Sequence, residues 1–221
     1  MRRPLPRIGH GRVLVDWVTE SLREAILQGY FEPGEKLDQD RIAEDLEVSR
    51  TPVREAVRVL ESEGFVEIRP HRGAFIATLT PRDVQEIYEV RGLIEAEIVR
   101  QVTPQIPSPV LDQLERSLAE GESRLQAGDV LGHYESDVYF HSTICEHAAN
   151  SLLKEILASL TNRIARVRRF AQHQPGYHLD QSFQEHRAIL EAMRGRDADK
   201  AAQAMRAHLA NSAARIQELM R

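Results

Sequence analysis

The stretch RIAEDLEVSRTPVREAVRVLESEGFVEI, from Arg41 to Ile68, decides the fold of the first third of the chain. Its apolar residues recur at helical spacing up to Leu46 and again from Val53 to Gly64, and a tight turn over Glu47–Ser49 separates the two runs. Two amphipathic helices joined by so short a turn are typical of a helix-turn-helix. We therefore predict that motif here.

The residues on either side complete a small domain. Apolar positions recur every three to five residues over 12–28, which predicts a preceding helix. Two β-prone runs, 65–68 and 74–77, are joined by a polar turn at 69–73 and predict a hairpin. Three helices and a hairpin make a winged helix-turn-helix, which we assign to residues 1–78.

A second domain, residues 79–221, is expected to begin at the capping box Thr80-Pro-Arg-Asp83, which has proline at the first helical position. No run typical of a strand follows. Helices are expected at 81–102, 109–127, 130–148, 151–173, 179–194 and 198–220. Their short connections favour an antiparallel all-α bundle, so the fold class of the chain is mainly α.

Composition limits the classes of function. The 221 residues suit two modest domains, and 42% hydrophobic with 29% charged residues is ordinary for a globular protein. No apolar run is long enough to span a membrane or to form a secretory signal, and the single cysteine, Cys145, excludes an intrachain disulfide framework. We expect a cytoplasmic protein with no membrane partner.

Arginines on the expected third helix point to DNA. Arg50, Arg54 and Arg58 are four residues apart and form one row beside the apolar face. Arginine grips phosphates and pairs with guanine, and the first two lie near the helix start, where recognition helices approach base edges. Residues 1–78 carry 12 Lys and Arg against 14 Asp and Glu. DNA binding must therefore depend on where the arginines lie, and a solvated surface row is the alternative.

This part of the sequence closely resembles the DNA-binding domain of the GntR family, most specifically in VSRTPVREA at 48–56 and HRGAFI at 71–76. The resemblance implies that the DNA contacts are made by Ser49, Arg50, Thr51 and Arg54, and on the wing by His71, Arg72 and Gly73. Glu47 departs from the family's turn glycine, and a left-handed backbone there would cost about 1 kcal/mol. Asp40 is acidic where relatives can contact DNA, so no contact is assigned to it.

A set of metal-binding side chains lies on the inward faces of three expected helices. Asp137 and His141 are four residues apart on one helix, and His186 and His208 lie on the apolar faces of two others. A lone histidine in such a place is usually an ordinary core residue. A buried carboxylate is costly without a partner, however, and a divalent cation would compensate its charge. We expect zinc first, with nickel, manganese or iron as alternatives.

The same residues resemble the FCD (FadR-like C-terminal) ligand-binding domain of that family, in its metal-binding group. The resemblance rests on DxxFH at 137–141, EH at 185–186 and HL at 208–209. It implies that Asp137, His141, His186 and His208 bind one metal, and that a small carboxylate often completes its coordination. It also implies a homodimer on a two-fold symmetric operator. Arg91 commonly faces the effector in this family; the alternative is a structural salt bridge to Glu95.

We therefore expect a DNA-binding transcriptional regulator, not an enzyme, whose operator binding is controlled by a small organic acid at the metal. A metal-dependent enzyme that uses the same site is the main alternative, because an open coordination position can also activate water. No zinc-protease motif, nucleophile elbow or phosphate loop supports it, and an enzyme would not explain residues 41–77. A purely structural metal is the third possibility.

Overall fold

The computed structural model describes residues 11–172, 174 and 180–221. It divides into two compact units, Met1–Leu79 and Thr80–Arg221. In the described part of the chain, no helix combines the length and the apolar character needed to cross a membrane.

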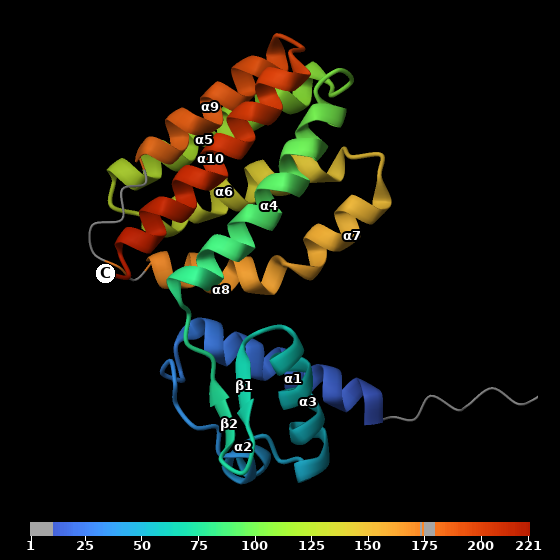
Figure 1. The fold of residues 1–221 in the computed structure, drawn as a ribbon, viewed down its shortest axis with the longest axis vertical. Helices are drawn as coiled ribbons and strands as arrows, with labels where there is room; N and C mark the ends of the chain where they lie inside the picture. Colours follow the sequence, from blue (N-terminus) through green and yellow to red (C-terminus); the bar gives the residue numbers. More distant parts are fainter. Residues whose placement is uncertain (1–10, 173, 175–179) are drawn as a thin grey trace, which may run out of the picture. The chain divides into compact units, whose positions relative to one another are not determined.

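Residues 11–79 form three helices and an antiparallel hairpin (Figure 1). The elements are α1 (Gly11–Gln28), α2 (Gln39–Asp45), α3 (Arg50–Ser62), β1 (Val66–Arg69) and β2 (Gly73–Ile76). Val66 pairs with Ile76 at one end of the hairpin and Arg69 with Gly73 at the other. The predicted winged helix-turn-helix is confirmed, with element ends within about two residues of those expected.

Local chemistry fixes the turn that presents α3. The Asp38 side chain accepts hydrogen bonds from the backbone N–H groups of Asp40 and Arg41 and so caps α2. Glu47 has φ +53°, the left-handed conformation that glycine adopts without strain, so the turn is built at a cost of about 1 kcal/mol. The buried core holds the helices in place through Val18, Leu22, Ile42, Val53, Leu60, Phe65 and Ile76.

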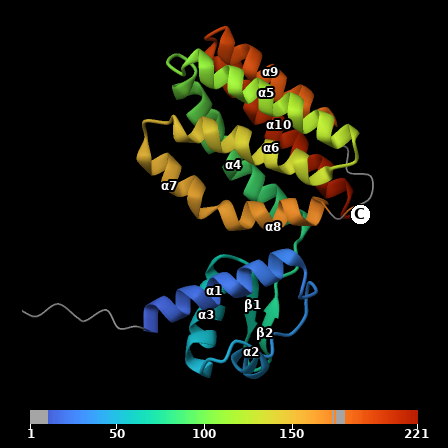
Figure 2. The ribbon, with the colours of Figure 1, turned by 180° about the vertical axis from the view of Figure 1, so that it is seen from behind.

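The second unit is a helical bundle, as predicted, and its described residues contain no strand (Figure 2). Its helices are α4 (Pro81–Val102), α5 (Ser108–Gln126), α6 (Val130–Glu146), α7 (Ser151–Ser159), α8 (Thr161–Gln172), α9 (Asp180–Arg194) and α10 (Ala198–Glu218). Helix α10 packs along α4 and α9, and α5 packs against α6 and α9. The inner faces of α4, α6, α9 and α10 therefore meet at the centre of the bundle.

The single helix predicted over 151–173 is wrong: the chain turns a corner at Leu160 and forms α7 and α8 (Figure 1). The Leu160 N–H bonds to the carbonyl of Leu157, three residues back, which ends α7. After the corner α8 buries Ile164 and Val167, whereas α7 buries no residue. Neither proline nor glycine marks the corner, so tertiary packing sets it. The predicted end at His173 lies outside the described residues.

Candidate metal centre, adjoining cavity and DNA-binding surface

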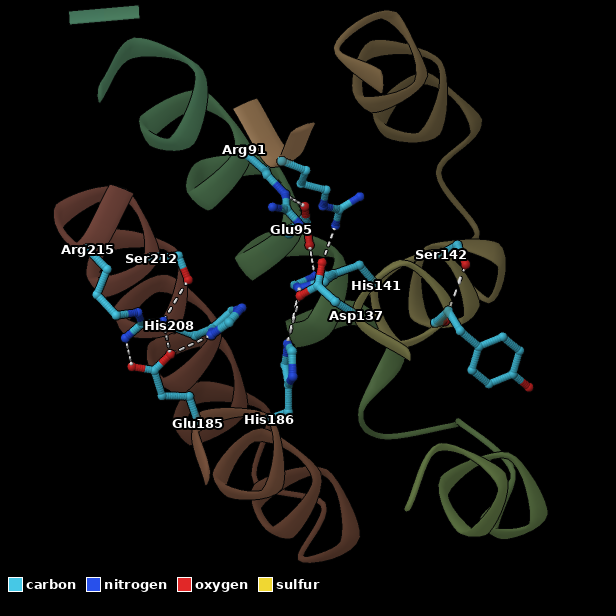
Figure 3. A network of polar contacts seen from close by, with 12 residues as sticks. Arg91, Glu95, Asp137, His141, Ser142, Glu185, His186, His208, Ser212 and Arg215 are labelled. Atoms are coloured by element: carbon cyan, nitrogen blue, oxygen red, sulfur yellow. Dashed lines mark hydrogen bonds and ion pairs between the residues drawn. The ribbon is translucent and has the colours of Figure 1, made fainter. Parts of the chain in front are cut away.

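The structure brings Asp137, His141, His186 and His208 together in the centre of the second unit (Figure 3). One possible ligand atom from each lies within 4.8 Å of the others, and the three histidines are buried. The Nε2 atoms of His141 and His186 are 3.2 Å apart, and each lies 3.6 Å from Oδ1 of Asp137. Two ligands of a tetrahedral zinc ion at about 2.1 Å are about 3.4 Å apart. These spacings therefore fit atoms that surround one ion.

Two carboxylates orient the imidazoles from outside the cluster. Nδ1 of His141 lies 2.5 Å from Oε2 of Glu95, and Nδ1 of His208 lies 2.7 Å from Oε2 of Glu185. An imidazole whose Nδ1–H donates to a carboxylate presents its Nε2 lone pair to the opposite side, which is the usual outer-shell support of a metal-binding histidine. Burial also lowers the pKa of His208 and favours its neutral form, the form that binds metals.

Asp137 is ionised and lies between the Arg168 guanidinium and the imidazoles of the cluster. Burial would raise the pKa of its carboxyl group, but the Arg168 guanidinium and the neighbouring imidazoles outweigh burial and hold that pKa well below its ordinary value. Nη2 of Arg168 lies 2.6 Å from Oδ2 of Asp137, while Oδ1 faces the Nε2 atoms of His141 and His186. One carboxylate oxygen therefore remains directed at the centre of the cluster.

Arg91 is buried and donates from Nε to Oε1 of Glu95, one helical turn further along α4. Burial would raise the pKa of Glu95, yet Arg91 and His141 lower it to about 2, so both partners are charged. The salt bridge that was the alternative interpretation of Arg91 is thus present. Through Glu95 it connects Arg91 to His141.

A cavity of about 310 Å³ opens beside the cluster, a volume suited to a small organic molecule. Its wall is formed by α4, α6, α7 and α8. His141 belongs to both the cluster and the cavity, and Arg168, the ion-pair partner of Asp137, also lines the cavity. Other lining residues include Arg91, Glu95, Ser142, Cys145, Lys154, Leu157 and Thr161. Burial raises the pKa of the Cys145 thiol to about 12, so this sulfur stays protonated at neutral pH and is a poor nucleophile.

Sequence reasoning missed several of these supporting residues. The sequence predicts Glu95 only as a partner of Arg91, because His141 lies 46 residues further along the chain on another helix. Glu185 adjoins His186 but serves His208. Arg168 lies in an arginine-rich stretch that resembles a solvated helix face, and only the inward turn of α8 brings it to Asp137.

The predicted DNA-contacting residues lie on two surfaces of the first unit. Arg50, Arg54 and Arg58 are exposed on α3, opposite its buried apolar face. Ser49 is the N-cap residue and Thr51 lies in the first turn; in the part of the chain that the structure describes, the Ser49 side chain makes no capping hydrogen bond. Nε of Arg50 lies 2.8 Å from Oδ1 of the exposed Asp40, an ion pair between the two helices of the motif.

The wing ends in an exposed, tightly turned tip. His71 has φ +61° and Gly73 has φ +107°, so two of its residues adopt left-handed backbone conformations. The Arg72 N–H bonds to the carbonyl of Arg69 at 3.0 Å and closes the turn. His71, Arg72 and Gly73 are all exposed at the end of the hairpin.

A winged helix-turn-helix followed by a helical domain with a possible ligand site is typical of a transcriptional regulator with separate DNA-binding and ligand-binding domains. Residues 14–76 match the model of the bacterial regulatory proteins of the gntR family, and residues 86–211 match that of the FCD domain. The chain belongs to the GntR family, in the group that carries an FCD domain. This agrees with both resemblances drawn from the sequence.

Relatives and solved structures cover nearly the whole chain. The uncharacterized HTH-type transcriptional regulator YdhC of Bacillus subtilis strain 168 is 30% identical, over 85% of this chain and 84% of its own. The galactonate operon transcriptional repressor of Escherichia coli strain K12 is 26% identical, over 92% of this chain and 97% of its own. The crystal structure of a GntR transcriptional regulator from Rhodococcus sp. RHA1 matches with a TM-score of 0.74 and 26% sequence identity. The match covers 92% of this chain and 97% of that one.

Proposed function

We propose that this regulator binds operator DNA through its first unit, and that a small carboxylate bound at a divalent metal in the second unit controls that binding. The observation that carries the proposal is the position of His141. Its imidazole belongs to the Asp137, His141, His186 and His208 cluster and also lines the 310 Å³ cavity. An ion in the cluster would therefore be reachable from the cavity.

The donor set supports a divalent transition metal. Three neutral imidazoles and one carboxylate suit zinc, our first choice, and also nickel, manganese or iron. The bound ion would supply positive charge and a further coordination position for an effector carboxylate. That position requires a coordination number above four, because the four side chains alone would complete a tetrahedral shell.

That same count favours one alternative function for the metal. Four converging protein ligands are typical of structural zinc, which stabilises a fold and binds no effector. The two functions differ in a measurable way. A structural ion raises the melting temperature but has no influence on effector binding. A sensing ion also raises the melting temperature, and the effector binds only when that ion is present.

The chemistry of the effector is supported from two sides. Arg91, Arg168 and Lys154 all line the cavity, which favours an anion. The repressor of the galactonate operon is named for a sugar acid, which is a carboxylate. We infer a small organic acid that contacts the metal through one carboxylate. Arg91 contributes positive charge to this site while it remains bonded to Glu95.

DNA binding is assigned to the residues of α3 and the wing. Ser49, Arg50, Thr51 and Arg54 lie at the start of α3, from which recognition helices contact base edges. His71, Arg72 and Gly73 form the tip of a wing that can contact the minor groove or its phosphates. Two such heads on a two-fold symmetric operator require a homodimer.

The test is a comparison of metal-free and metal-loaded protein. The protein is stripped with a chelator and reloaded with zinc or nickel, and the melting temperature is followed with and without small carboxylates. An acid that raises the melting temperature only of the metal-loaded protein supports the proposal. His141→Gln should lose the effect, while His147→Gln, at the C-cap of α6 and outside the cluster, should keep it. If the acid raised the melting temperature equally with and without metal, the ion would have only a structural role.

A further inference from the structure

The cations of the cavity are not equivalent. Arg91 is bonded to Glu95, and Arg168 forms an ion pair with Asp137. Lys154, on α7, also lines the cavity and is half-buried. Among the residues that the structure describes, no carboxylate lies within ion-pair distance of its ammonium group. Lys154 is therefore the cation whose charge the protein leaves uncompensated.

The acidic residues of the cavity do not change this balance. Glu95 is engaged by both Arg91 and His141. Glu146 is exposed at the end of α6, where water screens its charge more strongly than that of a half-buried group. A ligand that enters the cavity thus meets the uncompensated positive charge of Lys154. This residue lies on α7, which contributes no residue to the metal cluster.

We propose that Lys154 binds a second anionic group of the effector, so that the regulator selects acids with two anionic groups over monoacids of the same chain length. The inference rests on the proposed function, because the first carboxylate is the one held at the metal. A lysine suits this task, since its ammonium is a compact charge on a flexible stem and can follow anions of different reach. A charge-assisted hydrogen bond of this kind corresponds to about tenfold or more in affinity.

The test uses matched pairs of acids on zinc-loaded protein. Isothermal titration calorimetry measures the affinities of three pairs: butyrate and succinate, hexanoate and adipate, and gluconate and glucarate. The two acids of each pair differ only in one terminal group, and the pairs sample several chain lengths. In at least one pair we expect the diacid to bind about tenfold tighter or more. Lys154→Met should abolish this preference, because it weakens binding of the diacid much more than binding of the matching monoacid. Lys200→Met, an exposed lysine of α10 outside the cavity, should behave as wild type.

A second readout does not depend on any substitution. The chain has three lysines, at 36, 154 and 200, so amine acetylation followed by mass spectrometry can report each one separately. The preferred diacid should slow acetylation of Lys154 and leave Lys36 and Lys200 unchanged. The matching monoacid should protect none of them.

The possible failures are distinguishable. If the wild type binds mono- and diacids equally, if Lys154→Met keeps the preference, or if Glu146→Gln rather than Lys154→Met removes it, the inference is wrong and the metal-based function stands. If no acid binds the metal-loaded protein, or if acids bind equally well after chelation, the proposed function fails and the inference fails with it. Metal content and far-ultraviolet circular dichroism identify a variant that has lost its fold.

Discussion

Nδ1 of His141 lies 2.5 Å from Oε2 of Glu95, and this contact joins the metal cluster to the salt bridge on α4. The other oxygen of Glu95 accepts a hydrogen bond from Arg91. One buried carboxylate therefore orients a proposed metal ligand and also neutralises a cation of the cavity. The proposed metal site and the proposed effector site therefore share this residue.

Glu95→Gln should weaken metal binding by about 10–100-fold, although Glu95 is not one of the four proposed ligands. An amide at this position no longer supplies the negative charge that makes the His141 imidazole a better ligand. Competition with a chromophoric chelator measures the change. Glu97→Gln, a half-buried position of the same helix that is bonded to Arg100, is the matched control. Equal metal affinity of the two variants would remove Glu95 from the metal site.

Arg91→Ala should not separate effector binding from metal binding. Because Arg91 is paired with Glu95, its removal leaves a buried carboxylate without its cation, which costs about 3–5 kcal/mol and disturbs the partner of His141. We expect a lower free energy of unfolding and weaker zinc binding together. In a double-mutant cycle Arg91→Ala and Glu95→Gln should be strongly non-additive in urea denaturation. Additive effects would show that the two side chains act independently.

The metal-free protein should lose stability as the pH falls below 6.5, because of His208. Burial lowers the pKa of this imidazole in the folded state, so below its ordinary value of 6.5 the unfolded chain binds the proton more readily. The free energy of unfolding then falls with decreasing pH by at most about 1.4 kcal/mol per pH unit for this group. Urea denaturation at pH 7.5, 6.5 and 5.5 measures the slope. His208→Gln should flatten it, and an unchanged slope would assign the effect to another group.

Arg50→Ala and Arg54→Ala should each weaken binding to a selected operator by about 1–3 kcal/mol without changing metal content. The pair between Arg50 and Asp40 is exposed and contributes little to stability, so Arg50 can exchange Asp40 for DNA. Asp40→Asn should consequently bind DNA more tightly. Fluorescence anisotropy measures the three affinities, with the exposed Arg206→Ala of the second unit as control. Wild-type affinity in both arginine variants would remove α3 as the recognition helix.

Light scattering at micromolar concentration should give about twice the chain mass of 25.2 kDa before DNA is added. The physical reason is that a symmetric operator must be read by two heads held at a fixed spacing. A monomer under these conditions would contradict the proposed assembly.

The sequence predicts the winged helix-turn-helix and the convergence of Asp137 with three histidines for one physical reason. Apolar helix faces must meet in a bundle, so polar residues on those faces meet as well. The corner at Leu160 has no such signal, because it depends on how Ile164 and Val167 pack. The cavity wall and the inward position of Arg168 follow from that corner, and sequence periodicity alone could not provide them.

We propose that an acid held at the metal controls operator binding, and a single titration can test this proposal. Operator affinity is measured by anisotropy for zinc-loaded wild type, chelated wild type and zinc-treated His141→Gln, each with and without the acid that gives the largest thermal shift. We expect the acid to change operator affinity only in the zinc-loaded wild type. An equal change in the chelated protein would contradict it.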